Sequence, residues 1–282
     1  MPEGDTIFRT ARALDRALRG TLVTRFSSVF PRLNRLDEDA PIAGRSVERV
    51  EARGKHLLIW FTGELALRTH MRMSGSWHLY RPGEAWQRPR DQLRILLETA
   101  RFVAVAFQVH DAEWLDPGRI ERSALARLGP DVLGAEFDLE RTAERIVAER
   151  GRPICDVILD QRVLAGLGNV YKSELLFLTK LHPLRAAESV PRQAARELVR
   201  RARVLLKQNV DPAADGGGAI VTYRGLRRST RRADPGERSY VYARTGQACR
   251  SCATPIVSAL LGTPPRRTYF CPTCQPAAAP AP

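Results

Sequence analysis

Residues 161–174 read QRVLAGLGNVYKSE, and this stretch decides how the second half of the chain folds. It joins two segments of helical periodicity through a turn with Gly166 and Gly168, a residue type that can adopt backbone conformations that other residues avoid. Asn169 follows directly and is a residue type favoured as a helix N-cap. The amides at such a helix start point outward and bind phosphate, with Asn169 and Lys172 nearby. The pattern predicts either a clamp for a nucleic-acid backbone or a purely structural helical hairpin.

Helical periodicity continues on both sides of this turn. Asp138 is a suitable N-cap, because apolar residues recur at helical spacing directly after it. Pro153 suits the first turn of the helix that follows, where its missing N–H is not needed. The pattern predicts helices over residues 138–149, 153–161, 169–179 and 192–209.

The first half of the chain has a different pattern. Apolar residues at spacings of four and three predict one amphipathic helix over residues 5–19, which Gly20 ends. Short apolar or alternating runs then continue to about residue 115, and turn signals such as Thr62-Gly63 separate them. The runs that predict strands are residues 21–30, 56–61, 64–71, 93–98 and 102–107.

The two patterns together predict an α+β protein with more than one domain. Eight arginines and only two acids in residues 222–250 predict a segment that is mobile until it finds an anion. From Gln275 onward the chain is almost only Ala and Pro, which predicts a disordered tail. The predicted parts are a β-rich domain over 1–120, a hinge over 121–136, a helical domain over 137–225, a cysteine-containing domain over 240–275 and a tail over 276–282.

Four cysteines define the last domain. Cys249 and Cys252 form one CxxC pair, and Cys271 and Cys274 form another after 18 intervening residues. Two such pairs on hairpins can place four thiolates tetrahedrally around one zinc ion, with two redox dithiols or four unrelated thiols as the alternatives. A closed four-Cys site has no open position, so the zinc is expected to be structural. Cys155 lies in an apolar helical pattern and is expected in the core.

The charge of the chain favours a polyanionic partner. Lys and Arg number 45 against 31 Asp and Glu, which gives a net charge of +14. Arg266 and Arg267 lie between the two cysteine pairs, where a metal-stabilised hairpin would hold them stiffly against a phosphate. A solvated turn in an arginine-rich protein without a nucleic-acid role is the alternative.

The first residues and the apolar runs of the sequence do not suggest export or membrane insertion. No run approaches 18 apolar residues, and no basic region followed by an apolar stretch opens the chain. The sequence therefore predicts no membrane span, no secretory signal and a location in the cytoplasm. A reducing compartment disfavours disulfides, which agrees with cysteines that bind a metal.

Four motifs occur in order along the chain: Pro2-Glu3-Gly4, then Arg53-Gly54-Lys55-His56, then the Gly166-Leu167-Gly168-Asn169 turn, and finally the four-cysteine hairpin. Together they resemble the bacterial Fpg/Nei family of DNA glycosylases, from residue 2 to about residue 275. The resemblance implies a β-sandwich behind an N-terminal helix, a helix-two-turn-helix domain and a zinc finger. It also implies a monomer at the nucleoid that binds damaged double-stranded DNA without a nucleotide cofactor.

By this resemblance the nucleophile is Pro2, after removal of Met1. An α-amino group has a pKa of about 8 against about 10.4 for Lys, so more of it is neutral at neutral pH. The amine attacks C1′, expels the base and forms a Schiff base, and β and then δ elimination cut the strand. Glu3 is the expected proton shuttle for these steps. Its alternative role is only to complement the dipole of the first helix.

The resemblance also assigns residues that hold the DNA. Lys55, the only lysine in the first 171 residues, is expected to contact the phosphate or the lesion. Asn169 and Arg266 match the phosphate-gripping residues of the family, with Arg267 as the competitor of Arg266. Met73 is a candidate wedge into the base stack, or else a buried core residue.

The choice of substrate branch depends on what is missing. The Arg-Arg-Phe wedge of the 8-oxoguanine branch is replaced here by residues 108–112, which read QVHDA, and residues 211–240 contain no clear purine-capping loop. The sequence is more similar to endonuclease VIII, which favours oxidised pyrimidines and abasic sites. The alternatives are a formamidopyrimidine or 8-oxoguanine glycosylase, a catalytically silent damage-binding protein, and a zinc-ribbon nucleic-acid-binding module.

Overall fold

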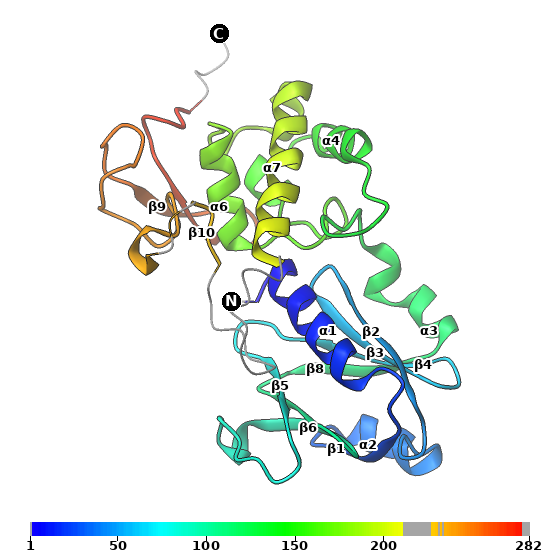
Figure 1. Ribbon diagram of the computed structural model, residues 1–282. Helices are drawn as coiled ribbons and strands as arrows, with labels where there is room; N and C mark the ends of the chain where they lie inside the picture. The colour runs from blue at the N-terminus through cyan, green and yellow to red at the C-terminus, as the bar shows by residue number, and fades with distance from the viewer. Residues whose placement is uncertain (1, 211–226, 231, 233, 278–282) are drawn as a thin grey trace. The chain divides into compact units, whose positions relative to one another are not determined.

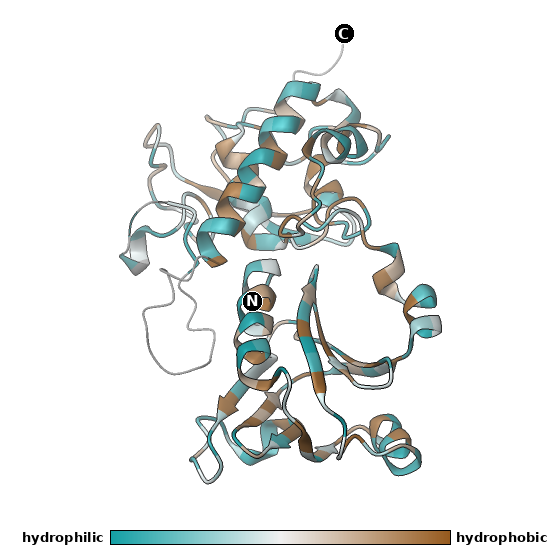
Figure 2. Ribbon diagram, turned by 45° about the vertical axis from the view of Figure 1, so that its right-hand side comes forward, coloured by the Kyte–Doolittle hydropathy of each residue, from teal (hydrophilic) through white to brown (hydrophobic). Residues whose placement is uncertain are grey.

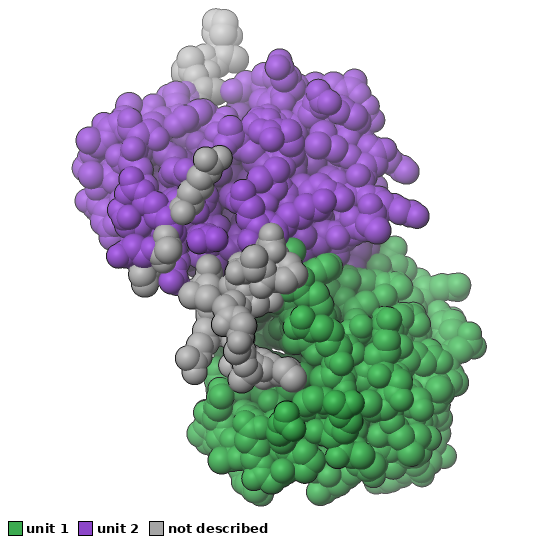
Figure 3. Space-filling model, viewed as in Figure 1, with its two compact units in different colours: residues 1–127, 210–225 green, residues 128–209, 226–282 purple. Residues whose placement is uncertain are grey.

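The structure of the chain, a computed structural model, describes residues 2–210, 227–230, 232 and 234–277. Their contacts group into two compact units (Figure 3). Of the described residues, one unit contains 2–127 and 210, and the other contains 128–209, 227–230, 232 and 234–277. Each unit has its own hydrophobic core.

Two four-stranded antiparallel sheets form the first unit (Figure 1). Their strand orders are β1-β6-β7-β5 and β2-β3-β4-β8. The strands are β1 Val23–Ser28, β2 Val47–Arg53, β3 His56–Phe61, β4 Leu65–His70, β5 Ser76–Tyr80, β6 Leu93–Thr99, β7 Val103–Phe107 and β8 Asp111–Leu115. The helices are α1 Gly4–Leu18, α2 Pro31–Asp39 and α3 Pro117–Arg122, with 3-10 turns at Arg90–Gln92 and Ala124–Arg127. This confirms the predicted β-sandwich behind an N-terminal helix.

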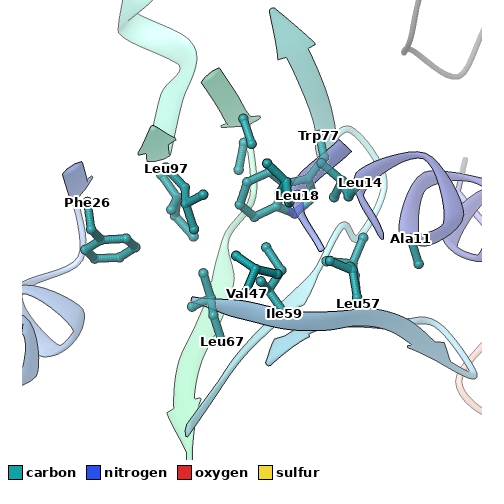
Figure 4. Packing of buried hydrophobic residues seen from close by; sticks show 14 of the residues in the cluster. Ala11, Leu14, Leu18, Phe26, Val47, Leu57, Ile59, Leu67, Trp77 and Leu97 are labelled. Atoms are coloured by element: carbon teal, nitrogen blue, oxygen red, sulfur yellow. The ribbon is translucent and has the colours of Figure 1, made fainter. Parts of the chain in front are cut away.

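The core of this unit lies between the two sheets and under α1. Leu57 and Ile59 of β3 and Leu97 of β6 are fully buried, and Leu14 of α1 packs into the same cluster (Figure 4). Alternate strand residues point to opposite faces, so one face of each sheet supplies the core. Complete burial of such a side chain stabilises the fold by about 1.5–3 kcal/mol.

The strand prediction was correct for the apolar runs and incomplete elsewhere. The run over 21–30 is wrong at its end, because the strand stops at Ser28 and Pro31 begins α2. Proline suits a first helical turn and cannot extend a paired strand. The apolar runs do not reveal β2, β5 or β8, because polar residues fill the alternate positions of these strands.

The second unit is helical and carries a two-stranded hairpin. Its helices are α4 Leu139–Val147, α5 Ile154–Val157, α6 Asn169–Leu178 and α7 Arg192–Val210, with 3-10 turns at Ala187–Ser189 and Pro235–Glu237. The hairpin strands are β9 Val257–Leu261 and β10 Arg266–Phe270. Along α7, polar and apolar residues alternate with the helical period, and its apolar side enters the core (Figure 2).

Local side-chain bonds explain which helix predictions were correct. Asp138 is the N-cap of α4 as predicted, since its carboxylate accepts the Arg141 amide at 2.9 Å. The helix predicted over 153–161 is wrong, because α5 ends at Val157. The Asp160 carboxylate accepts the Arg162 amide at 3.0 Å, which favours a turn over a continued helix.

A buried carboxylate organises the arginine-rich segment. Glu174 of α6 is fully buried and accepts the amides of Tyr240, Val241 and Tyr242 at 2.7, 2.9 and 2.8 Å. It also accepts the Ser229 hydroxyl. The prediction that residues 222–250 stay mobile until they find an anion is therefore wrong for the described part, because Glu174 is an internal anion that holds it.

The predicted tail begins too early at Gln275. This side chain is fully buried, accepts the Cys271 amide at 3.0 Å and donates to the Leu181 carbonyl at 2.9 Å. Residues 278–282 lie outside the described part, so the rest of the tail prediction is not tested. Among the described residues, no helix is both long and apolar enough to cross a membrane.

Candidate functional site

A pocket of about 290 Å³ opens in the first unit beside the start of α1. One side comes from the N-terminal segment and the other from the turn between β4 and β5. It brings together two of the predicted site residues, Pro2 and Met73. The lining residues are Pro2, Thr6, Thr10, Met71, Met73, Ser74, Gly75, Ser76, Trp77, Arg88 and Gln108.

The turn between β4 and β5 holds Met73 outward by a tight local structure. Gly75 donates its amide to the Met71 carbonyl at 2.8 Å, and a Cβ on Gly75 would lie 2.5 Å from that oxygen. Only glycine fits such an approach. Met71 is in the core with 1% exposure, whereas Met73 is 66% exposed. Met73 is therefore not a core residue, which leaves the wedge as its predicted role.

Pro2 and Glu3 differ in their exposure. Pro2 is half-buried and lines the pocket, while Glu3 is fully buried at the N-cap position of α1. The Glu3 side chain makes no capping hydrogen bond, and it is not among the lining residues. Its carboxylate thus lies next in sequence to Pro2 without capping the helix.

Lys55 lies in the turn between β2 and β3, outside the pocket lining. Gly54 has a φ of +60°, which lets Arg53 and His56 pair across a two-residue turn. The half-buried Lys55 is close enough to His70 for its charge to help lower the pKa of that histidine.

A buried arginine organises the outward face of the same sheet. Arg68 donates from Nε to Glu113 at 2.6 Å, from one terminal nitrogen to Asp111 at 2.6 Å, and pairs with His56 Nδ1 at 3.0 Å. The pairing register places His56 opposite His70, and His70 opposite Asp111. Sequence reasoning missed this cluster, although polar residues at alternate positions of β4 and β8 are a usable signal.

The two histidines of this cluster are neutral near neutral pH. Burial, followed by the charge of His70 and of Arg68, lowers the pKa of His56 to about 3. Burial and the charge of Arg72 lower the pKa of His70 to about 4, with smaller contributions from Lys55 and Arg68. The positive charge on this face therefore comes from arginine and lysine.

In the second unit, α6 meets β10 and brings together residues nearly a hundred positions apart. Asn169 donates from Nδ2 to the Arg267 carbonyl at 2.8 Å. The N-cap of α6 is Gly168 and not Asn169, so the predicted capping role of Asn169 is wrong. Its side-chain amide binds the hairpin instead of capping the start of its own helix.

The same contact buries Lys172. This side chain has 0% exposure and donates to the Thr268 hydroxyl at 2.6 Å. Ser173 adds a bond by accepting the Tyr269 amide at 3.4 Å. Burial argues against the predicted contact of Lys172 with DNA, and its position supports a structural role that holds β10 on α6.

The two hairpin arginines differ in their bonds. Both are exposed on β10, and Arg267 contacts the Ser258 hydroxyl at 3.4 Å. Within the described part of the chain, the guanidinium of Arg266 makes no hydrogen bond or ion pair. Adjacent strand residues point to opposite faces, so the two cations serve different sides of the hairpin.

Four thiols converge at the base of the hairpin. The sulfur atoms of Cys249, Cys252, Cys271 and Cys274 all lie within 4.8 Å of one another. A tetrahedral zinc ion with Zn–S bonds of about 2.3 Å holds its sulfurs about 3.8 Å apart. Separations of 3.5 and 3.9 Å between these sulfurs fit that geometry, so the cluster can bind a metal. Amides of Ser251 and Cys274 also point at the sulfurs at 3.4 Å.

Comparison with known proteins places the chain in a family. Residues 1–112 match the model of the formamidopyrimidine-DNA glycosylase N-terminal domain, and residues 128–220 match its H2TH domain. The chain is 39% identical to a probable endonuclease 8 2 of Streptomyces coelicolor, over 100% of this chain and 96% of that protein. It is 36% identical to the Mycolicibacterium smegmatis DNA-(apurinic or apyrimidinic site) lyase Nei2, over 98% of this chain and 100% of the relative.

The fold agrees with solved structures of the same family. Lactococcus lactis Fpg, solved in complex with DNA that contains an abasic site, superposes with a TM-score of 0.79 at 23% identity. The match covers 98% of this chain and 100% of that one. The chain therefore belongs to the family of formamidopyrimidine-DNA glycosylases and endonucleases VIII.

Proposed function

We propose that this protein is a bifunctional DNA glycosylase and abasic-site lyase of base excision repair. The observation that carries the proposal is Pro2 in the lining of a pocket that also contains the exposed Met73. A proline at the mature N-terminus has a secondary amine, which forms a Schiff base with an opened sugar. The lyase name of the Nei2 relative supports the second half of the activity.

The reaction uses Pro2 as nucleophile and Glu3 as proton shuttle. The lone pair of the Pro2 amine forms a bond to C1′ of the damaged nucleotide, and the base leaves with the electrons of the glycosidic bond and a proton. Ring opening gives an iminium, which makes the protons on C2′ more acidic. Loss of a C2′ proton expels the 3′-phosphate, and a second elimination expels the 5′-phosphate. The buried Glu3 carboxylate, next to Pro2, carries protons in these steps.

Phosphate contacts hold damaged double-stranded DNA during the reaction. We assign this role to Lys55 in the first unit and to Asn169 and Arg266 in the second, with Met73 as the wedge that replaces the everted nucleotide. Arg266 is favoured over Arg267 for the phosphate contact, because its guanidinium has no partner among the described residues. The protein acts as a monomer in the cytoplasm, at the nucleoid.

Oxidised pyrimidines are the proposed lesions. The relatives at 39% and 36% identity have endonuclease 8 and Nei2 in their names. Residues 108–112 replace the Arg-Arg-Phe wedge of the 8-oxoguanine branch, and the first of them, Gln108, lines the pocket. Any purine-capping loop within residues 211–226 lies outside the described residues.

A single structural zinc ion is proposed for the four cysteines. Four thiolates at tetrahedral separations are a ligand set that zinc prefers, and they leave no position for a water or a substrate. When bound, zinc stabilises the hairpin that presents Arg266 and takes no part in the chemistry.

Borohydride trapping tests the activity. The experiment uses untagged protein with its N-terminus verified by mass spectrometry, on duplexes with thymine glycol, 8-oxoguanine or an abasic site. We expect a covalent adduct with thymine glycol and the abasic site. Protein that retains Met1 is the matched control, because it differs only in the blocked amine, and it should bind DNA without trapping. Trapping by that control would contradict the role of Pro2, and binding without any adduct would contradict the enzymatic function.

A further inference from the structure

A chain of hydrogen bonds runs along β5 and ends in the pocket. Ser76, His78 and Tyr80 occupy alternate positions of this strand, so their side chains share one face. The Ser76 hydroxyl lies 2.9 Å from His78 Nε2, and His78 Nδ1 lies 2.9 Å from the Tyr80 hydroxyl. Ser76 is also a lining residue of the pocket that contains Pro2.

The two hydrogen bonds of the Tyr80 phenol set the direction of the chain. The Gln87 N–H can only donate, and it donates to the Tyr80 oxygen at 3.0 Å. The phenol proton of Tyr80 also needs an acceptor, and His78 Nδ1 is the only other partner of this hydroxyl among the described residues, so the phenol donates to Nδ1. Because a neutral imidazole has one donor and one acceptor nitrogen, Nε2 carries the proton and donates to the Ser76 oxygen.

His78 is well suited to hold one tautomer. It is almost fully buried, and the ring of Phe107 packs edge-on against it at a centroid distance of 5.0 Å. Burial, together with the nearby charge of Arg88, lowers the pKa of His78 to about 4, so the ring is neutral. Burial raises the pKa of Tyr80, which keeps its phenol protonated.

The Ser76 hydroxyl is left with its proton directed away from His78. Its oxygen accepts from Nε2, so its O–H needs another acceptor, and no described residue supplies one. We propose that Ser76 donates this hydrogen bond to an acceptor oxygen of the nucleotide everted into the pocket, and that His78 and Tyr80 are positioning residues that aim it. The inference rests on the proposed function, because it needs a nucleotide beside Pro2.

Two oxygens of that nucleotide could accept the bond. One is a carbonyl of an oxidised pyrimidine, and the other belongs to the sugar or its phosphate. An abasic site keeps the sugar and phosphate oxygens and lacks the carbonyl of the base. Comparing lesion and abasic duplexes therefore separates the two sources.

The first test measures single-turnover rates of S76A and S76T on thymine glycol and abasic duplexes. A neutral hydrogen bond that is lost in a desolvated site costs about tenfold in rate, and threonine, which keeps the hydroxyl, should restore most of it. A loss only with thymine glycol assigns the bond to the base, and a loss with both assigns it to the sugar or phosphate. Equal rates for S76A and wild type on both duplexes would overturn the inference, while Pro2 adducts of the wild type would still support the proposed function. A wild type that forms no adduct overturns both.

The second test asks whether His78 acts through Ser76. H78F removes the aiming nitrogen and keeps a buried ring, so it should slow the same substrate about as much as S76A. In the double variant, H78F should add less than twofold to the loss from S76A, because there is no longer a hydroxyl to aim. Additive losses would mean that His78 is only structural.

The tautomer itself can be observed. Two-bond ¹H–¹⁵N spectra of protein labelled at its five histidines should show His78 neutral, with a protonated Nε2 and a bare Nδ1. Y80F, which removes the donor to Nδ1, should shift that pattern toward the other tautomer while the fold is retained. A wild-type His78 protonated at Nδ1, or at both nitrogens near neutral pH, would refute the proposed direction of the chain.

Discussion

The side-chain amide of Asn169 donates to the main-chain carbonyl of Arg267 at 2.8 Å, and this bond joins the start of α6 to the hairpin of β9 and β10. It also fixes the orientation of the amide, because only Nδ2 can donate to a carbonyl. Among the described residues, the buried Oδ1 atom has no partner. Asn169 therefore positions the hairpin, and the second proton of Nδ2 is left available for a phosphate.

Substitution of Asn169 tests both roles. In N169D a carboxylate oxygen replaces the donor and faces the Arg267 carbonyl, so we expect a loss of about 1–3 kcal/mol in unfolding free energy. N169A removes the bond without adding repulsion and should cost less stability. Both should weaken DNA binding, measured by fluorescence anisotropy beside a urea titration. Equal stability of N169D and the wild type would show that the bond is unimportant.

The hairpin arginines are distinguished by salt dependence. R266A should weaken DNA binding across all sequences and reduce the slope of log K against log salt by about one. R267A is the matched control, because Arg267 is adjacent to Arg266 on the same strand and points to the other face of the hairpin. A reduced slope in R267A with an unchanged slope in R266A would transfer the phosphate contact to Arg267.

Glu174 should be essential for stability. In E174Q one oxygen becomes an amide donor that faces backbone N–H groups, which leaves buried groups unpaired and costs about 2–4 kcal/mol. E140Q is the control, because Glu140 forms an exposed ion pair with Arg196 and should cost less than about 1 kcal/mol. Chemical denaturation measures both. An E174Q protein as stable as E140Q would mean that another contact holds residues 240–242.

Acid should destabilise the first unit through buried histidines whose pKa values are lowered, which are His56, His70 and His78 among the described residues. His56 and His70 have pKa values of about 3 and about 4 in the fold, below the ordinary value of 6.5. Below about pH 6.5 the unfolded chain therefore binds more protons than the folded one, so stability rises with pH in this range and is lost on acidification. Urea midpoints between about pH 7 and pH 5 measure this, and the H56Q/H70Q variant should show a flatter profile. An unchanged slope in the variant would assign the effect to other groups.

Removal of the metal should affect the second unit selectively. A chelator that strips the four thiolates should expose the amides of β9 and β10 to hydrogen exchange and weaken DNA binding. The strands of the first unit should keep their protection, because their core does not include the cysteines. Full retention of DNA affinity by metal-free protein would contradict the role of the hairpin.

The sequence by itself determined features that depend on local rules. Apolar periodicity located α1, α7 and the strand β3, and Asp138 marked the start of α4. The two CxxC pairs indicated the four-cysteine cluster, because ligand spacing is a local property of the chain. Motif order was enough to indicate the family.

Only the tertiary structure decided what the polar side chains do. It buried Lys172 against Thr268, turned Asn169 from a helix cap into a link to Arg267, and aligned Ser76 with His78. It also used Glu174 as the anion for the arginine-rich segment. These outcomes depend on partners distant in sequence, and a buried polar group must find such a partner because an unmet hydrogen bond is costly away from water. Local patterns encode where a chain bends and what it buries, whereas the pairing of buried polar groups is decided when the elements pack.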